Sequence, residues 1–182
     1  FESSVEAFRK SLKRLETIHK HFLAALDEGF VPAGTDAQKL LYESDKYGDE
    51  ADLIEDLKII SGKYYIADFD EPKLREHLEA DKKLIRKMYD IVALITPEKD
   101  AKLHTLATGL QSNIPKETGK VLIFTQYADT AHYLHEQLNP EGKHKDIDAI
   151  YGTDKSKARM AARFSPRANK HINVGKDSEV RI

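Results

Sequence analysis

The chain has 182 residues, of which 40% are hydrophobic, and its formal charge at pH 7 is −2. This composition can supply a core, whereas the absence of cysteine excludes disulfides and thiolate metal sites. No stretch of about 18 apolar residues is present and no signal-peptide pattern opens the chain, so we expect a cytoplasmic protein with no membrane partner.

The first part of the chain, residues 1–116, has the apolar spacing of helices. After Ser3–Ser4, apolar residues recur three or four positions apart, which predicts a long amphipathic helix capped by these serines and ended by Gly29. A loop should follow over Phe30–Thr35, with a short helix after it. We therefore expect residues 1–116 to form a helical region.

A second long helix is predicted to start at Glu71–Pro72, because proline suits a first helical turn. Its buried stripe should consist of seven apolar residues. These are Leu74, Leu78, Ile85, Met88, Ile91, Val92 and Ile95. Thr96–Glu98 then predicts the start of a third helix, whose buried face carries Leu103, Leu106 and Leu110.

The pattern changes at Lys120. Val121–Phe124 is a continuous apolar run, typical of a strand buried on both faces in a parallel sheet. A helix should follow, then a second strand over residues 147–152, a helix over Lys155–Phe164 and a third strand over Val180–Ile182. This order predicts right-handed parallel crossovers. The expected fold class is α/β with a large all-helical part, in which long helices precede an incomplete parallel sheet with flanking helices.

A polar group follows the first predicted strand, at Thr125, Gln126 and Tyr127. The carboxyl end of a parallel strand is where open α/β sheets bind ligands, and the helix start that comes next offers backbone N–H groups to a phosphate. An ordinary turn between a strand and a helix would have the same pattern, so this group does not define a site by itself.

A second group follows the second predicted strand. Gly152 allows another group to approach the backbone closely, Thr153 is next to it, and Arg159 and Arg163 lie four residues apart on one face of the next helix. From Lys155 to Lys170 the chain has six basic residues and no acidic one, and such a run can face phosphates. The alternative is a solvated surface helix with ordinary arginines.

Together with Asp100–Leu103, these groups resemble in order and spacing the second motor domain of superfamily 2 helicases of the Swi/Snf type, especially their bacterial members. The segment Lys120–Tyr127 is similar to motif IV of that family. The segment Gly152–Phe164 is similar to the neighbouring motif IVa. The resemblance covers residues 100–182.

The resemblance implies two domains. Residues 1–116 would be the helical region, and residues 117–182 the N-terminal part of a truncated second RecA-like domain. The chain would then be a fragment of an ATP-dependent helicase or translocase that acts on double-stranded DNA, without the first RecA-like domain of that protein. The residues implied as nucleic-acid contacts are Thr125, Gln126, Tyr127, Gly152, Thr153, Arg159 and Arg163.

The family uses ATP and magnesium, but this chain lacks the residues that bind them. No Gly-x-x-x-x-Gly-Lys-[Ser/Thr] sequence is present to hold the phosphates, and no Asp-Glu-x-His-type pair to hold magnesium. We therefore predict no catalytic residue and no cofactor in this chain, with ATP and magnesium bound elsewhere in the parent protein. His132 and His135 have no third ligand nearby in sequence, so no metal site is predicted.

Other functions are compatible with the same residues. The helices could form a non-enzymatic protein-interaction module, because the seven acids between Glu43 and Asp56 would repel DNA and suit a basic partner. An independent flavodoxin-like domain would need about five strands, and only three fit. An incomplete sheet would also leave an open edge, through which the chain could self-associate.

Overall fold

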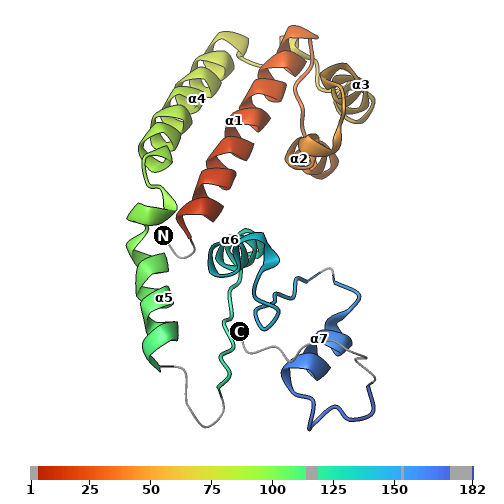
Figure 1. The fold of residues 1–182 in the computed structure, drawn as a ribbon. Coiled ribbons are helices and arrows are strands. Elements are labelled where there is room, and N and C mark those ends of the chain that lie inside the picture. Colours follow the sequence, from red (N-terminus) through yellow and green to blue (C-terminus); the bar gives the residue numbers. More distant parts are fainter. Residues whose placement is uncertain (1–3, 114–118, 153, 173–181) are drawn as a thin grey trace. The chain divides into compact units, whose positions relative to one another are not determined.

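The computed structural model describes residues 4–113, 119–152, 154–172 and 182. The chain divides into two compact units (Figure 1). The first, here the α1–α4 unit, is Arg9–Leu94, and the second, the α5–α7 unit, combines Phe1–Phe8 with Ile95–Ile182. The chain passes from one unit to the other at Phe8–Arg9 and again at Leu94–Ile95. The predicted boundary between residues 116 and 117 lies outside the described residues.

Four helices supply most of the α1–α4 unit. They are α1 (Val5–Asp27), α2 (Thr35–Tyr42), α3 (Glu50–Ser61) and α4 (Glu71–Ala93). Short 3-10 turns at Ser44–Lys46 and Ile66–Asp68 lie between them. The acidic segment Glu43–Asp56 is therefore partly helical, because α3 begins in the middle of it.

The ends of the two long helices confirm the predicted cap and stop of α1 and the predicted start of α4. The Ser4 hydroxyl accepts a hydrogen bond from the backbone N–H of Ala7 at 3.1 Å, as a helix N-cap does. After α1 the backbone turns at Gly29, whose φ of 84° is a conformation that glycine adopts without strain. At the start of α4 the Asp70 carboxylate accepts from the backbone N–H of Lys73 at 3.2 Å.

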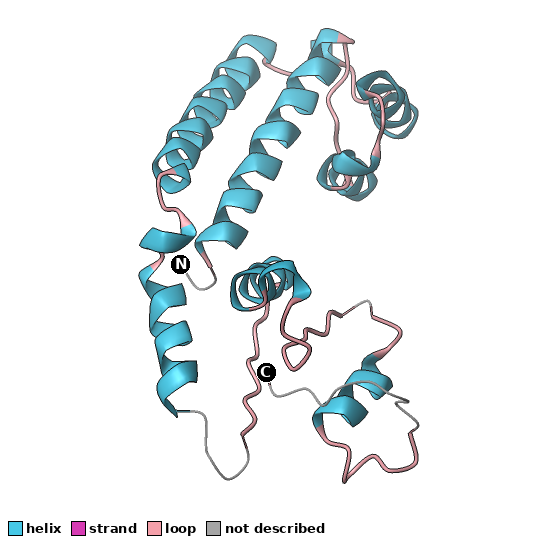
Figure 2. Cartoon of the chain, in the orientation of Figure 1, coloured by secondary structure: helices cyan, strands magenta, loops and turns pink. Residues whose placement is uncertain are grey.

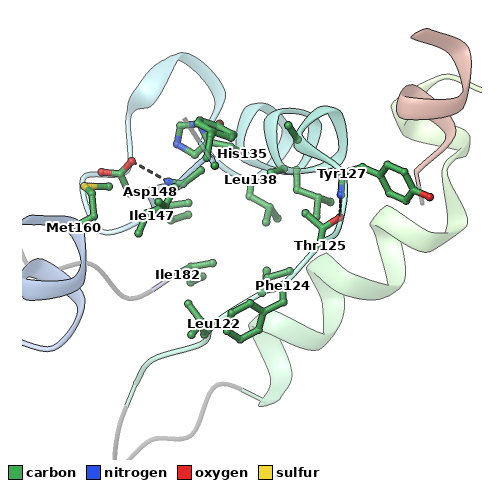
Figure 3. A pocket seen from close by; sticks show the side chains of 18 of the residues that line it. Leu122, Phe124, Thr125, Tyr127, His135, Leu138, Ile147, Asp148, Met160 and Ile182 are labelled. Carbon is green, nitrogen blue, oxygen red and sulfur yellow. Dashed lines mark hydrogen bonds between the residues drawn. The ribbon is translucent and has the colours of Figure 1, made fainter. Parts of the chain in front are cut away.

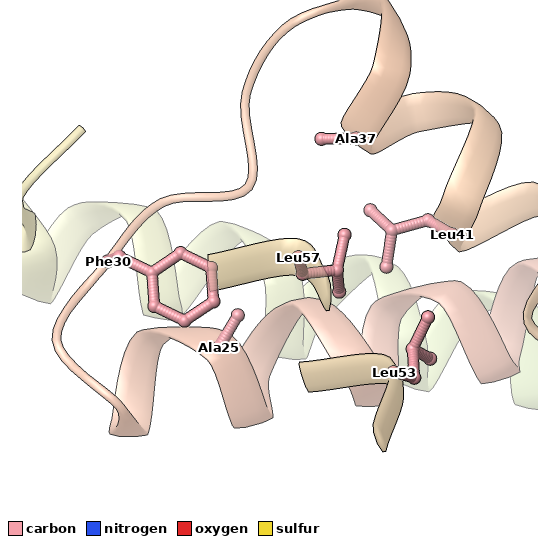
Figure 4. Close-up of a cluster of buried hydrophobic side chains, with 6 residues drawn as sticks. All are labelled: Ala25, Phe30, Ala37, Leu41, Leu53 and Leu57. Carbon is pink, nitrogen blue, oxygen red and sulfur yellow. The ribbon is translucent and has the colours of Figure 1, made fainter. Parts of the chain in front are cut away.

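The core of the α1–α4 unit lies where α1, α2 and α3 meet. Figure 4 shows its six buried side chains, contributed by all three helices and the loop after α1. They are Ala25, Phe30, Ala37, Leu41, Leu53 and Leu57. The buried Ser61 hydroxyl at the end of α3 donates to the carbonyl of Ala33, 3.3 Å away, so this polar group is satisfied inside the core.

His21 of α1 is a buried titratable group with incomplete hydrogen bonding. It is 8% exposed, its Nδ1 has no hydrogen-bond partner in the described part of the chain, and its Nε2 lies 3.9 Å from Glu50 Oε1. Burial lowers the pKa of His21, an effect that Lys20 reinforces and Glu50 opposes. The neutral imidazole is therefore the form that suits the folded protein.

Acidification should consequently destabilise the protein through His21. The pKa of this histidine in the unfolded chain is the ordinary value of 6.5, above its folded value, so the unfolded state binds more protons as the pH falls below that value. The free energy of unfolding should begin to drop as the pH falls through 6.5, and it should drop less for His21→Leu. Urea titrations of both proteins at several pH values check this, and parallel pH dependences would contradict it.

The outward face of α4 is more apolar than predicted. Ile85 and Val92 are buried, and Leu74 packs against a second buried cluster, as expected. Met88 and Ile91, however, are 37% and 67% exposed, so the prediction that they are buried is wrong. The apolar stripe that the sequence places on α4 is therefore wider than the part of this helix that the rest of the unit covers.

The α5–α7 unit contains three shorter helices. They are α5 (Ala101–Asn113), α6 (Ala128–Leu138) and α7 (Lys157–Phe164). The carboxylate of Asp100, which is 4% exposed, caps α5 by accepting from the backbone N–H groups of Lys102 and Leu103 at 3.1 and 3.0 Å. No described helix in either unit has the length and apolar content needed to cross a bilayer.

Among the residues that the structure describes, the predicted RecA-like parallel sheet is not formed. The described residues contain helices, turns and loops but no strand, as Figure 2 shows. Residues 121–124 are extended, but no described residue hydrogen-bonds to their backbone, and Leu122 and Phe124 are 58% and 86% exposed. The α/β fold class, long helices followed by an incomplete sheet, is therefore wrong in its second half.

The second predicted strand also remains a single extended segment. Its clearest strand-like feature is a pair of backbone hydrogen bonds, in which Ile182 N–H donates to Asp146 and Asp148 N–H donates to Ile182, at 3.1 and 2.9 Å. Of the third predicted strand, Val180–Ile182, only Ile182 is among the described residues. An apolar run specifies burial, but a strand also requires a neighbour of matching register along its length.

Candidate functional site

The described part of the α5–α7 unit contains a hollow of about 640 Å³ (Figure 3). It lies between the extended residues 122–127, helix α6, the extended residues 147–152 and one face of α7. Its lining is mostly apolar, with Leu122, Phe124 and Ile182 among the side chains around it. Polar groups lie mainly in the two segments that the sequence singled out.

The first polar group lines this hollow directly before α6. Thr125, Gln126 and Tyr127 are all exposed. The Thr125 hydroxyl accepts a hydrogen bond from the backbone N–H of Tyr127 at 3.3 Å, and Tyr127 is the residue that precedes the first turn of α6. The same residues also line a second hollow of about 330 Å³ on the side of α5. The segment is therefore accessible from two sides.

The second polar group reaches the same hollow through Gly152. This glycine is exposed, and a methyl group built on it would have no heavy atom within 4 Å, so the space at this rim is open. Tyr151 beside it stacks on His132 of α6, with ring centroids 3.8 Å apart. Burial raises the pKa of Tyr151, and the nearby Asp154 carboxylate adds to this effect. Thr153 lies outside the described residues.

The two predicted arginines of α7 have different surroundings. Arg163 is partly buried and pairs with the carboxylate of Asp148, and it also donates to the backbone carbonyl of Lys145 at 3.2 Å. Arg159 is exposed. Neither lines the hollow, toward which α7 presents Met160 instead. Thr125–Tyr127 and Gly152 thus line one hollow, whereas the two arginines do not line it.

Further basic residues surround α7. Lys157 donates from its ammonium group to the backbone carbonyl of Gly152, so one cation lies at the rim of the hollow. Lys155, Arg167 and Lys170 are exposed. In contrast to these, Lys120 donates to the carbonyl of Phe164 and lies 5.5 Å from the centre of its ring. It therefore links the first motif to the end of α7.

The sequence motif that contains Asp100 indicated only part of the role of this residue. Besides capping α5, its carboxylate accepts a hydrogen bond from the hydroxyl of Tyr133 on α6, at 3.0 Å and in a buried position. One side chain thus fixes the start of one helix and ties it to another. An acid that precedes a helix and is followed three residues later by leucine was the available signal, and it indicated only a helix start.

The described residues provide no metal-binding group. No cluster of three or more histidine, aspartate or glutamate side chains with suitable geometry occurs among them. His132 is engaged in stacking on Tyr151, and His135 lines the hollow near Asp148 (Figure 3). Comparisons with protein-family models, with curated proteins and with solved structures found no match to this chain.

Proposed function

We propose that the surface around the larger hollow binds nucleic-acid phosphates and serves an ATP-dependent helicase or translocase. The motor assignment comes from the resemblance of residues 100–182 to the Swi/Snf type. The ATP and magnesium of such a motor would be bound by residues other than these. Phosphate binding requires the contact residues to be close together, and it does not require a parallel sheet between them.

The observation that supports this proposal is the meeting of two motif segments at one hollow. Thr125–Tyr127 and Gly152 come from different parts of the sequence, yet they line the same concave surface and are exposed. Hydroxyl and amide side chains bind phosphate oxygens, and exposed lysine and arginine residues neutralise phosphate charge. Lys157 at the rim and the exposed Arg159 on α7 supply that charge.

Arg163 has a different role in this proposal. Because its guanidinium is paired with Asp148 and partly buried, it fixes α7 against the extended segment before it. The cationic contacts would instead come from exposed residues such as Lys155 and Arg159. Reversing the charge of Arg163 would test folding, so a binding experiment should leave it intact.

Double-stranded DNA should bind with a strong dependence on salt, and Lys155→Glu/Arg159→Glu should weaken this binding. Loss of two phosphate contacts should reduce the slope of log K against log salt concentration by roughly 2, because each contact contributes about 0.9. Fluorescence anisotropy of a labelled duplex across a salt series measures both quantities. Single-stranded DNA of the same length shows whether the duplex is preferred.

The matched control reverses two exposed lysines of the α1–α4 unit, Lys13→Glu/Lys39→Glu, and changes the net charge by the same amount. It should retain most of the affinity and the slope if binding is local. Equal weakening by both variants would mean that only net charge matters, and the proposed surface would then be rejected.

A further inference from the structure

Helix α4 and the residue that caps its end, Leu94, carry an apolar stripe that faces away from the core. Leu84, Met88, Ile91 and Leu94 are 57%, 37%, 67% and 71% exposed. They are spaced four, three and three residues apart, which places them on one side of a helix. The residues that α4 buries in the core, Ile85 and Val92, lie on the adjacent side.

A stripe of this kind differs from a scattered set of exposed apolar residues. Single exposed leucines are common, but neighbouring large apolar side chains on one face are typical of interaction surfaces. Leu84, Met88 and Ile91 also have the spacing with which one helix packs along another. The stripe therefore has the geometry of a helix-binding surface.

Two lysines lie along one edge of the stripe. Lys83 and Lys87 are exposed, lie one helical turn apart, and have no ion-pair partner in the described part of the chain. The nearby carboxylate of Asp90 is engaged by Arg86 at 3.1 Å, and Arg86 also lies 3.6 Å from Glu16. The lysines are thus the charges that a partner would meet at this edge.

We propose that this stripe, defined by Leu84, Met88, Ile91 and Leu94, is a docking site for an acidic amphipathic helix of a partner protein. The apolar side chains of that helix would pack on the stripe, in the helix-to-surface mode of peptide recognition. Its carboxylates would pair with Lys83 and Lys87. Exposed pairs of this kind add little affinity, but they select the partner and its orientation.

Two other occupants fit the stripe less well. A nucleic acid would use the lysines but leave the apolar residues in water. A second copy of this chain, paired about a two-fold axis through the stripe, would bring the same lysine-edged surface against itself, and like charges would repel. The proposal is independent of phosphate binding by the α5–α7 unit, since it concerns other residues.

The test uses the full chain and a labelled designed peptide of about three heptads, with leucine at positions a and d and glutamate at positions e and g. A second peptide has lysine in place of each glutamate. Fluorescence anisotropy should show that the acidic peptide binds more tightly than the basic one. Leu84→Ser/Ile91→Ser should weaken the acidic peptide roughly tenfold or more, whereas Ile59→Ser, which alters an exposed isoleucine of α3, should not.

The charge-swap variant Lys83→Glu/Lys87→Glu should reverse the preference, so that the basic peptide binds more tightly. Circular dichroism of each variant confirms that the helices persist, which is expected because every altered side chain is exposed. The proposal is overturned if the acidic peptide does not bind, if the serine variant binds it equally well, or if the charge swap changes nothing. Sedimentation that shows a dimer disrupted by the serine variant would also overturn it, because a second copy would then occupy the stripe.

Discussion

Replacing Asp100 with alanine should lower the free energy of unfolding of the α5–α7 unit by roughly 2–4 kcal/mol. The variant loses the cap of α5, which is worth about 1 kcal/mol. It also leaves the hydroxyl of Tyr133, a buried donor, without this acceptor, at a cost of about 1–3 kcal/mol.

Urea denaturation followed by far-ultraviolet circular dichroism measures this loss. Tyr133→Phe removes only the donated hydrogen bond and should cost about 1 kcal/mol. Tyr42→Phe is the matched control, because Tyr42 is 58% exposed and its hydroxyl accepts from Arg14 at the surface. A loss for Asp100→Ala no larger than for this control would contradict the buried linkage between α5 and α6.

The helices were largely predictable because their signals are local. A capping side chain, a period of about 3.6 residues and a stop at glycine are all within one or two turns of the residues they organise. Ser4, Gly29 and Asp70–Glu71 accordingly mark helix ends in the structure. The start of α5 was displaced, since Thr96 begins only a 3-10 turn and Asp100 caps the helix itself.

The strands were not predictable in the same way. Val121–Phe124 has the composition of a buried strand, but pairing depends on residues far away in sequence, and no described segment hydrogen-bonds to it. The buried face of α4 was predicted too wide for the same reason, since its extent also depends on residues far away in sequence. How much of an apolar stripe becomes buried depends on how many neighbours the helix has, which its own sequence does not encode.

The candidate contacts illustrate the limit of reading charge from sequence. Arg159 and Arg163 looked equivalent because they share a helical face, but in the structure Arg163 is partly buried and pairs with the carboxylate of Asp148, whereas Arg159 is exposed. An ion pair of this kind cannot be read from the spacing of residues along one helix, because its two members lie 15 residues apart in sequence. The polar groups Thr125–Tyr127 and Gly152, which the sequence named separately, line one hollow, although the sheet expected to join them is absent from the described residues.

Leu57→Ala should destabilise the α1–α4 unit by roughly 2–5 kcal/mol, the range for truncating a fully buried leucine. Leu57 is 0% exposed and belongs to the cluster in which α1, α2 and α3 meet, where Phe30 and Leu41 also lie (Figure 4). These helices depend on each other, because α2 and α3 are too short to be stable alone. Loss of the packing around Leu57 should therefore destabilise α1, α2 and α3 together.

Two further variants test whether the cost of Leu57→Ala comes from lost packing in this cluster. Leu57→Met keeps most of the volume and should cost less than about 1.5 kcal/mol. Ile59→Ala, two residues further along the same helix but at a position that is 77% exposed, should change stability by less than about 0.5 kcal/mol. Urea titration of the three variants separates the cost of lost packing from any effect of the changed helix propensity. If Leu57→Ala and Ile59→Ala were equally mild, the three helices would not share a core, and the acidic helix α3 would be a surface attachment.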